Sequence, residues 1–88
     1  MGRYWQNCFH HLYVVNNTRN KKTLSKFGKH LRSLRISKGF SQQDLAYEAE
    51  INKNQIGNIE RGEVNPTLTT LLNIANSLNI SISELVNF

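Results

Sequence analysis

The sequence predicts an all-α protein with five short helices. Apolar residues recur three or four positions apart from Leu24 to the C-terminus, which is typical of helices that bury one face. Helix-capping residues precede four of these stretches, and no stretch alternates as strands do. Residues 1–23 lack the periodicity and are rich in aromatic and basic residues. We therefore expect a basic, aromatic N-terminal arm over residues 1–23 and one small helical domain over residues 24–88.

The first helix of the domain is expected to begin at Leu24 and to be stopped by Gly39. Its apolar stripe consists of Phe27, Leu31 and Leu34. Before it, residues 16–22 are polar and predict a flexible segment. The large aromatic residues nearer the N-terminus are expected to dock on the domain or on a partner, or to belong to a disordered extension; they are Tyr4, Trp5, Phe9 and Tyr13.

The second and third helices are predicted over residues 42–49 and 53–60. Ser41 and Asp44 form a capping box for the second helix, Asn52 caps the third, and Gly62 is placed to end it. The residues expected to face inward are Leu45, Ala46, Ala49, Ile56 and Ile59.

The fourth helix follows a tight loop at Asn65-Pro66 and is capped by Thr67, and a second capping box, Ser81 with Glu84, starts a short last helix. The residues expected to face inward are Leu68, Leu71, Ile74, Ala75 and Leu78 in the fourth helix and Ile82, Leu85 and Val86 in the last.

The second and third helices, joined by a turn at residues 50–52, have the spacing of a helix-turn-helix. In this geometry the third helix presents polar side chains outward, namely Lys53, Asn54, Gln55 and Asn58. These side chains offer donors and acceptors that pair with base edges in the major groove of DNA. A merely solvated face would be expected to carry charge pairs four residues apart, and this face has none. The pattern favours a recognition helix for duplex DNA.

The distribution of charge also favours nucleic acid. Up to Gln43 the chain has nine basic residues and no acidic one, whereas beyond it six acidic residues face only Lys53 and Arg61. The net charge of +5 therefore divides into +9 and −4. A concentrated positive field attracts polyanions. An acidic membrane is the competing partner, but the sequence has no basic amphipathic helix with bulky apolar anchors.

A family resemblance runs through most of the domain. Its segments are Phe27 to Arg35, Lys38 to Ala46, Ile56 to Gly62, Asn65-Pro66 and Leu71 to Leu78. Through them, residues 26–88 resemble the lambda-repressor-like helix-turn-helix family, also called Cro/repressor or XRE type. The segment from Ile56 to Val64 looks most like the controllers of restriction-modification systems. The resemblance implies a five-helix all-α domain, usually a homodimer on a two-fold DNA operator.

The resemblance also implies roles for single residues. Lys53, Asn54 and Asn58 take base-contacting places, and Gln55 lies beside the backbone or a base. The residues implied to contact phosphates are Gln42, Arg61, Asn65 and Thr67. The positions of Arg35 and Glu60 form a buried ion pair in many members, which makes these two residues architectural.

Two positions depart from the family pattern. Glu50 stands in the turn where the family usually has glycine, and a non-glycine residue with positive φ costs about 1 kcal/mol. We therefore expect a turn that is locally different or strained. Gly57, inside the third helix, costs roughly 1 kcal/mol relative to alanine. Its missing side chain allows either a close approach to DNA or more freedom for Asn58.

Several classes of function are excluded by what the sequence lacks. It has no paired carboxylates, nucleophile with a base, or phosphate-binding glycine loop, so we expect neither an enzyme nor a cofactor. His30 is expected on the surface or facing phosphate. Cys8, His10 and His11 lack a fourth ligand, so no metal site is expected. A single cysteine, no signal peptide and no long apolar span indicate a cytoplasmic protein without a membrane anchor.

We predict a homodimeric transcriptional regulator, either a repressor or a restriction-modification controller. Apolar residues near the C-terminus exceed what a small domain buries and predict the dimer interface, which we assign to Leu72, Ile82, Val86 and Phe88. Two alternatives stay open at this point. The aromatic arm could cover this surface within a monomer, or it could bind a toxin protein, which would make the chain an autoregulating antitoxin.

Overall fold

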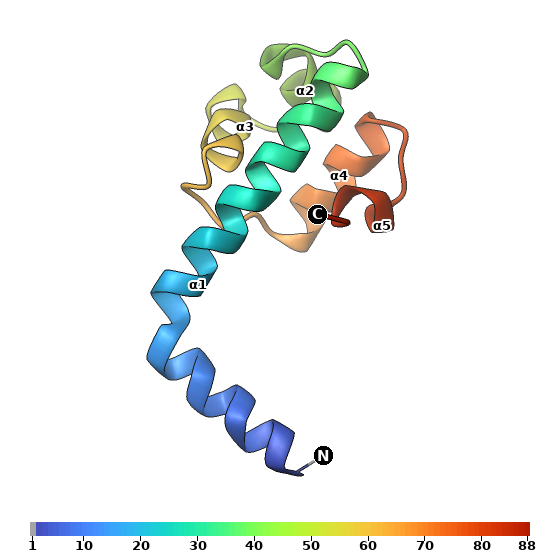
Figure 1. Ribbon diagram of the computed structural model, residues 1–88. Helices are drawn as coiled ribbons and strands as arrows, with labels where there is room; N and C mark the ends of the chain where they lie inside the picture. The colour runs from blue at the N-terminus through green and yellow to red at the C-terminus, as the bar shows by residue number, and fades with distance from the viewer. Residues whose placement is uncertain (1) are drawn as a thin grey trace.

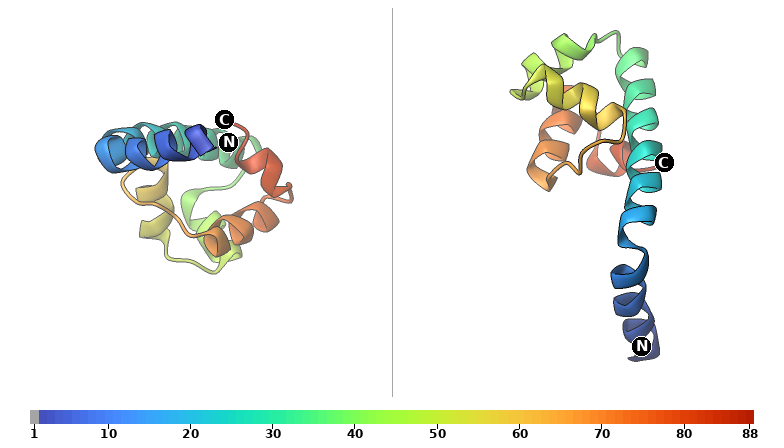
Figure 2. Two further views of the ribbon diagram at one scale, coloured as in Figure 1. Left: turned by 90° about the horizontal axis from the view of Figure 1, so that it is seen from below. Right: turned by 90° about the vertical axis from the view of Figure 1, so that its left-hand side faces the viewer.

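The computed structural model describes the backbone of residues 2–88 and the side chains of residues 20–88. Along this backbone the chain forms five helices and no strand, which confirms the predicted all-α fold class. The helices are α1 (Gly2–Ser37), α2 (Gln42–Ala49), α3 (Lys53–Glu60), α4 (Leu68–Ser77) and α5 (Ile82–Leu85). Helices α2 to α5 gather around the C-terminal half of α1, and the N-terminal half of α1 extends beyond them (Figures 1 and 2).

The first helix is longer than the sequence predicts. It begins at Gly2 rather than at Leu24, and residues 20–22, expected in a flexible polar arm, are part of it. The expectation was wrong because it relied on apolar periodicity alone. Neither glycine nor proline occurs between Arg3 and Phe27, so no residue interrupts the helix before the domain. The aromatic side chains expected to dock elsewhere lie outside the described residues.

The four predicted caps are confirmed. The Ser41 hydroxyl accepts a hydrogen bond from the Asp44 backbone N–H at 3.0 Å, and the Asp44 carboxylate accepts one from the Ser41 N–H at 3.2 Å. Ser81 and Glu84 form the same reciprocal pair. Single caps start the other two helices: Asn52 accepts from the Asn54 N–H, and Thr67 from the Thr70 N–H. Each cap satisfies a backbone donor that a helix start otherwise leaves unpaired.

The core lies between the C-terminal half of α1 and the four shorter helices. Its buried apolar residues are Phe27, Leu31, Leu45, Ala46, Ala49, Ile56, Ile59, Ile74, Ala75, Leu78 and Leu85. Two residues expected to face inward do not: Leu68 is 66 % exposed and Val86 43 %. The buried face of α4 instead includes Thr70. At 3.6 residues per turn, Leu68 lies about 90° from the middle of that face, so no neighbouring helix covers it.

Helices α1 and α3 meet at a point where only glycine fits. A Cβ at Gly28 would lie 2.3 Å from the backbone oxygen of Glu60 and 2.5 Å from that of Ile59. Just beyond α3, a Cβ at Gly62 would lie 2.8 Å from the backbone of Ser25. Backbone atoms cannot move aside as the end of a side chain can. The two glycines therefore fix how closely α3 packs on α1.

A buried ion pair joins the same two helices. The Arg35 Nε lies 2.6 Å from Glu60 Oε2, and Arg35 Nη2 lies 3.1 Å from Glu60 Oε1. The third nitrogen, Nη1, donates to the carbonyl oxygen of Phe40 at 2.8 Å. Both charged side chains are at least nine-tenths buried. This fork-to-fork geometry fixes direction as well as distance, because a guanidinium and a carboxylate are both planar.

The turn between α2 and α3 adopts the backbone conformation that glycine favours. Glu50 has φ 58° and ψ 43°, in the left-handed region. In this conformation its N–H donates to the Tyr47 carbonyl, and the next N–H, of Ile51, donates to the Ala46 carbonyl at 2.9 Å. The turn therefore ends α2 as a glycine would. It also carries the strain of a β-carbon at positive φ.

Removing one partner of the buried pair should destabilise the fold strongly. We expect Arg35→Met and Glu60→Leu each to lower the free energy of unfolding by about 3–5 kcal/mol, because each leaves an uncompensated charge inside the protein. The double variant should recover much of this loss. Urea denaturation measures all three. Glu63→Gln, which breaks an exposed ion pair with Arg61, is the matched control and should cost under about 1 kcal/mol. Additive losses in the double variant would contradict the prediction.

Relief of the strained turn should stabilise the protein. Glu50→Gly is expected to raise the free energy of unfolding by up to about 1 kcal/mol, which corresponds to a rise in Tm of roughly 4–8 °C for a domain of this size. Asn79 also has φ 58°, and asparagine tolerates this region better, so Asn79→Gly is the control and should gain less. A neutral or destabilising Glu50→Gly would show that the glutamate side chain itself contributes to the turn.

Candidate nucleic-acid interface

Helices α2 and α3 form the predicted helix-turn-helix, and their close crossing exposes one face of α3. Ala46 and Ala49 on α2 are buried, as are Ile56 and Ile59 on α3. The polar residues at the start of α3 point away from this contact: Lys53 and Asn54 are exposed, and Gln55 and Asn58 are partly exposed. The small alanines allow the two helices to approach, and the buried isoleucines fix which face of α3 remains outside.

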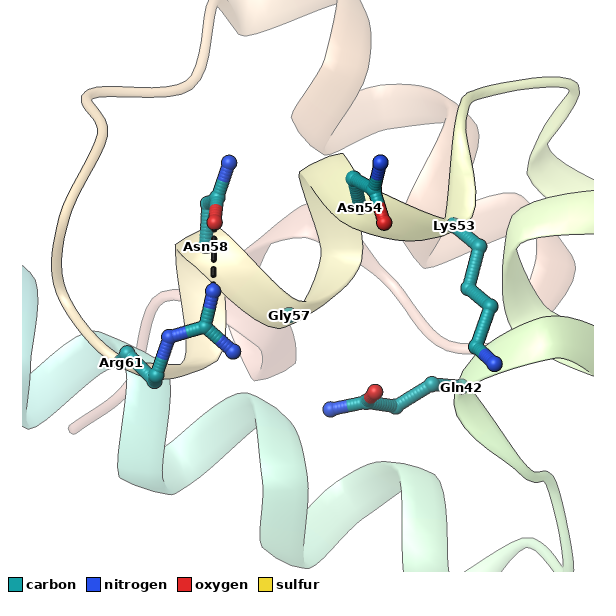
Figure 3. A pocket seen from close by; sticks show the side chains of 6 residues that line it. All are labelled: Gln42, Lys53, Asn54, Gly57, Asn58 and Arg61. Atoms are coloured by element: carbon teal, nitrogen blue, oxygen red, sulfur yellow. Dashed lines mark hydrogen bonds between the residues drawn. The ribbon is translucent and has the colours of Figure 1, made fainter.

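An open pocket of about 300 Å³ lies along this face. It is lined by Gln42, Lys53, Asn54, Gly57, Asn58 and Arg61 (Figure 3). Two of the six side chains are cationic, two are amides of α3, and none is acidic. Another pocket of similar size is lined by both Glu48 and Glu50, so the two hollows differ in charge. Only the first has the composition that suits a polyanion.

Gln42 connects this pocket to the buried ion pair. Its amide Nε2 donates a hydrogen bond to Glu60 Oε1 at 3.0 Å, and the same oxygen accepts from Arg35. The Gln42 amide therefore has a fixed orientation at the first position of α2. One Nε2 hydrogen is used by Glu60, and the other remains for a ligand in the pocket.

Arg61 lies across the end of α3, where it contacts two neighbours. Its Nη2 donates to Asn58 Oδ1 at 2.5 Å, and its Nε donates to Glu63 Oε2 at 3.1 Å. This contact with Asn58 was not predicted from the sequence. The signal was present, because residues three apart on a helix are neighbours.

The remaining residues with implied DNA contacts lie outside the pocket lining: Gln55, Asn65 and Thr67. Asn65 is exposed in the loop between α3 and α4. The Thr67 hydroxyl is engaged at the start of α4, where it accepts from the Thr70 N–H and donates to the Thr70 hydroxyl. Any contact of Thr67 with a phosphate would therefore come from its backbone.

The C-terminal segment leaves apolar side chains at the surface. Leu72 is 42 % exposed, Val86 43 % and Phe88 52 %, while Ile82 is partly buried against the core. The Phe88 ring packs edge-on against Phe27, with the ring centroids 5.5 Å apart.

His30 lies beside the C-terminal segment and not in the pocket. Its Nε2 is 3.1 Å from the backbone oxygen of Glu84, and its ring lies beside that of Phe88. The expectation that His30 faces phosphate is therefore not supported by its position: the side chain helps to hold the chain end against α1.

The described part of the chain holds neither a cluster of metal ligands nor a membrane-spanning helix. Over residues 20–88, no three His, Cys, Asp or Glu side chains converge on a point that could hold a metal ion. The side chains of Cys8, His10 and His11 lie outside the described residues. None of the described helices is both long enough and apolar enough to cross a membrane.

Comparisons with known proteins agree with this geometry. The control protein C.BamHI of Bacillus amyloliquefaciens is 35 % identical over 63 residues, which are 70 % of this chain and 78 % of that protein. The control protein C.SmaI of Serratia marcescens is 38 % identical over 58 residues, 66 % of this chain and 69 % of that protein. The crystal structure of the restriction-modification controller protein C.AhdI from Aeromonas hydrophila superposes with a TM-score of 0.70 at 42 % identity, over 70 % of this chain and 94 % of that one.

The profile of the helix-turn-helix family HTH_3 matches residues 31–85, a range that contains the whole of α2, the turn and α3. The chain therefore belongs to the XRE-type helix-turn-helix family.

Proposed function

We propose that this protein is a sequence-specific transcriptional regulator of the repressor or restriction-modification controller kind, which acts in the cytoplasm as a homodimer on a two-fold operator in duplex DNA. The observation that carries the proposal is the exposed polar face of α3, with a pocket that holds Lys53 and Arg61 and no acidic side chain. The relatives named above are controllers of the same size class, which supports the regulator over an antitoxin. The antitoxin reading depended on aromatic side chains outside the described residues.

In this proposal the start of α3 enters the major groove. Lys53, Asn54, Gln55 and Asn58 read base edges, since amides and ammonium groups match the donors and acceptors displayed there. The residues beside the groove contact the phosphate backbone: Gln42, Arg61, Asn65 and Thr67. Arg35 and Glu60 make no contact with DNA and act by holding α3 and Gln42 in place.

The exposed apolar residues of α4 and the C-terminal segment supply the dimer interface. Leu72, Val86 and Phe88 are each about half exposed, and apolar side chains that gather on one surface mark an interface. Ile82, at their edge, is partly buried. A two-fold contact at this surface would set the two α3 helices about 34–36 Å apart, the spacing of successive major grooves on one side of DNA.

Binding to duplex DNA should depend steeply on salt. If a dimer neutralises roughly six to ten phosphates, the affinity should fall about 10³- to 10⁵-fold between 50 and 200 mM salt, because bound counterions are released from the DNA. Fluorescence anisotropy with a labelled duplex measures this slope. An affinity that does not change over this range would exclude an electrostatic interface.

Base-reading and phosphate contacts should separate by mutation. Lys53→Ala and Asn54→Ala should each lower the preference for the selected site over random DNA by about 1–3 kcal/mol. Gln42→Ala should weaken binding to both kinds of DNA about equally, because a phosphate contact carries no sequence information. Asn76→Ala, on the exposed face of α4, is the control and should change neither. Equal losses on specific and random DNA from all three site variants would contradict the assignment.

The protein should be a dimer in solution. Sedimentation equilibrium at tens of micromolar should give a dimer for the wild type and a monomer for Leu72→Glu combined with Val86→Glu, since each carboxylate would have to lose its hydration in an apolar contact. Circular dichroism of the variant controls for folding. A monomeric wild type would contradict the proposed interface.

A further inference from the structure

The contact between Arg61 and Asn58 fixes which atoms of the asparagine face the pocket. A guanidinium carries only donors, so the amide atom that faces it must be the oxygen Oδ1. The amide nitrogen then points away from Arg61 (Figure 3). At 2.5 Å between Arg61 Nη2 and Asn58 Oδ1, this is a short hydrogen bond of the charge-assisted kind, and it holds the amide against rotation.

Two neighbours hold the guanidinium in this place. The Glu63 carboxylate accepts from Arg61 Nε at 3.1 Å. On the helix itself, a Cβ at Gly57 would lie only 3.0 Å from Arg61 Nη1. The absence of a side chain at Gly57 therefore makes room for the guanidinium against α3. This gives the glycine inside the recognition helix a function that its helix propensity does not explain.

The arrangement determines what Asn58 offers to a base. An unrestrained asparagine pairs with adenine through both amide atoms, since the oxygen accepts from N6 and the nitrogen donates to N7. Here Oδ1 accepts from Arg61 with one lone pair and keeps the second for adenine N6, while Nδ2 can still donate to N7. The contact therefore holds the amide in one of its two orientations, with the oxygen and the nitrogen in set places. In the other orientation the nitrogen would stand opposite the N6 amino group, donor against donor.

We infer that Arg61 is a specificity-determining residue: by holding the Asn58 amide in one orientation, it makes Asn58 select adenine at one base pair of each half-site. The inference rests on the proposed function and deepens it. A phosphate contact through Nη1 is compatible with it, because Nη2 and Nε are the atoms used by Asn58 and Glu63.

Binding-site selection from a randomised duplex library, with the full chain, tests the inference. The wild type should select adenine at one position per half-site. Arg61→Lys keeps the charge but loses the planar fork, so at that position alone the preference for adenine should fall about tenfold, or roughly 1.4 kcal/mol, and other bases should become acceptable. Asn58→Ala should relax the same position. The double variant should lose no more than the larger single loss, because the two residues act as one unit.

A second variant keeps the test independent of Arg61 itself. Gly57→Ala should shift the guanidinium by a few tenths of an ångström and weaken the preference at the same position, while thermal unfolding shows the stability unchanged or raised by the better helix former. Asn76→Ala should select the wild-type site. If Arg61→Lys weakens binding to all sequences equally and leaves every base preference intact, Arg61 contacts phosphate only and the inference is overturned. If the wild type shows no preference for any sequence, the proposed function is contradicted. The inference, which rests on that function, is then contradicted as well.

Discussion

The guanidinium of Arg35 and the carboxylate of Glu60 form a buried contact, and the relative positions of α1, α2 and α3 depend on it. Three groups converge on it: α1 supplies the arginine, α3 the glutamate, and α2 the Gln42 amide that shares the same carboxylate oxygen. A buried ion pair is weak evidence of stability, because loss of hydration offsets much of the attraction. Its effect here is on orientation. Because Glu60 binds both Arg35 and Gln42, the rotation of α3 about its own axis and the position of the Gln42 amide at the edge of the pocket depend on each other.

The described basic residues in the first half of the chain fall into two groups, one buried and one exposed. Of the basic residues in the first half, Arg35 is neutralised inside the protein and contributes nothing to the external field. The other described ones are exposed along α1 or, in the case of Lys38, directly after it, and none of them is in the pocket. In the proposed complex, long-range attraction of DNA and local recognition would thus come from different groups. The exposed cations would raise the rate and strength of association, while Lys53, Arg61 and the amides of α3 would act at contact distance.

Much of the fold could be predicted because its signals are local. A cap needs only one hydroxyl or amide oxygen and an N–H two or three residues away. The sequence alone therefore predicts the caps at Ser41, Asn52, Thr67 and Ser81. Leu68 was misplaced because its burial depends on where α4 packs, which no neighbouring residue specifies. The start of α1 was missed because helix continuity there depends on the absence of a breaker rather than on an apolar stripe. In the site, the exposed residues of α3 followed from its period, whereas the link from Gln42 to Glu60 spans 18 residues and requires the tertiary structure.

The pocket combines restrained and unrestrained side chains, and the two kinds contribute differently to recognition. Gln42 and Asn58 have their amides fixed by Glu60 and Arg61, so each presents a set pattern of donors and acceptors before DNA arrives. Groups held in this way lose little entropy on binding. Lys53 makes no hydrogen bond or ion pair among the described residues and keeps its long, mobile chain. In the proposed complex it would lose more entropy on contact with a base than the restrained amides do. The two restraints would serve different contacts there: the buried ion pair holds the Gln42 amide that is proposed to contact phosphate, and Arg61 holds the Asn58 amide that is proposed to read a base.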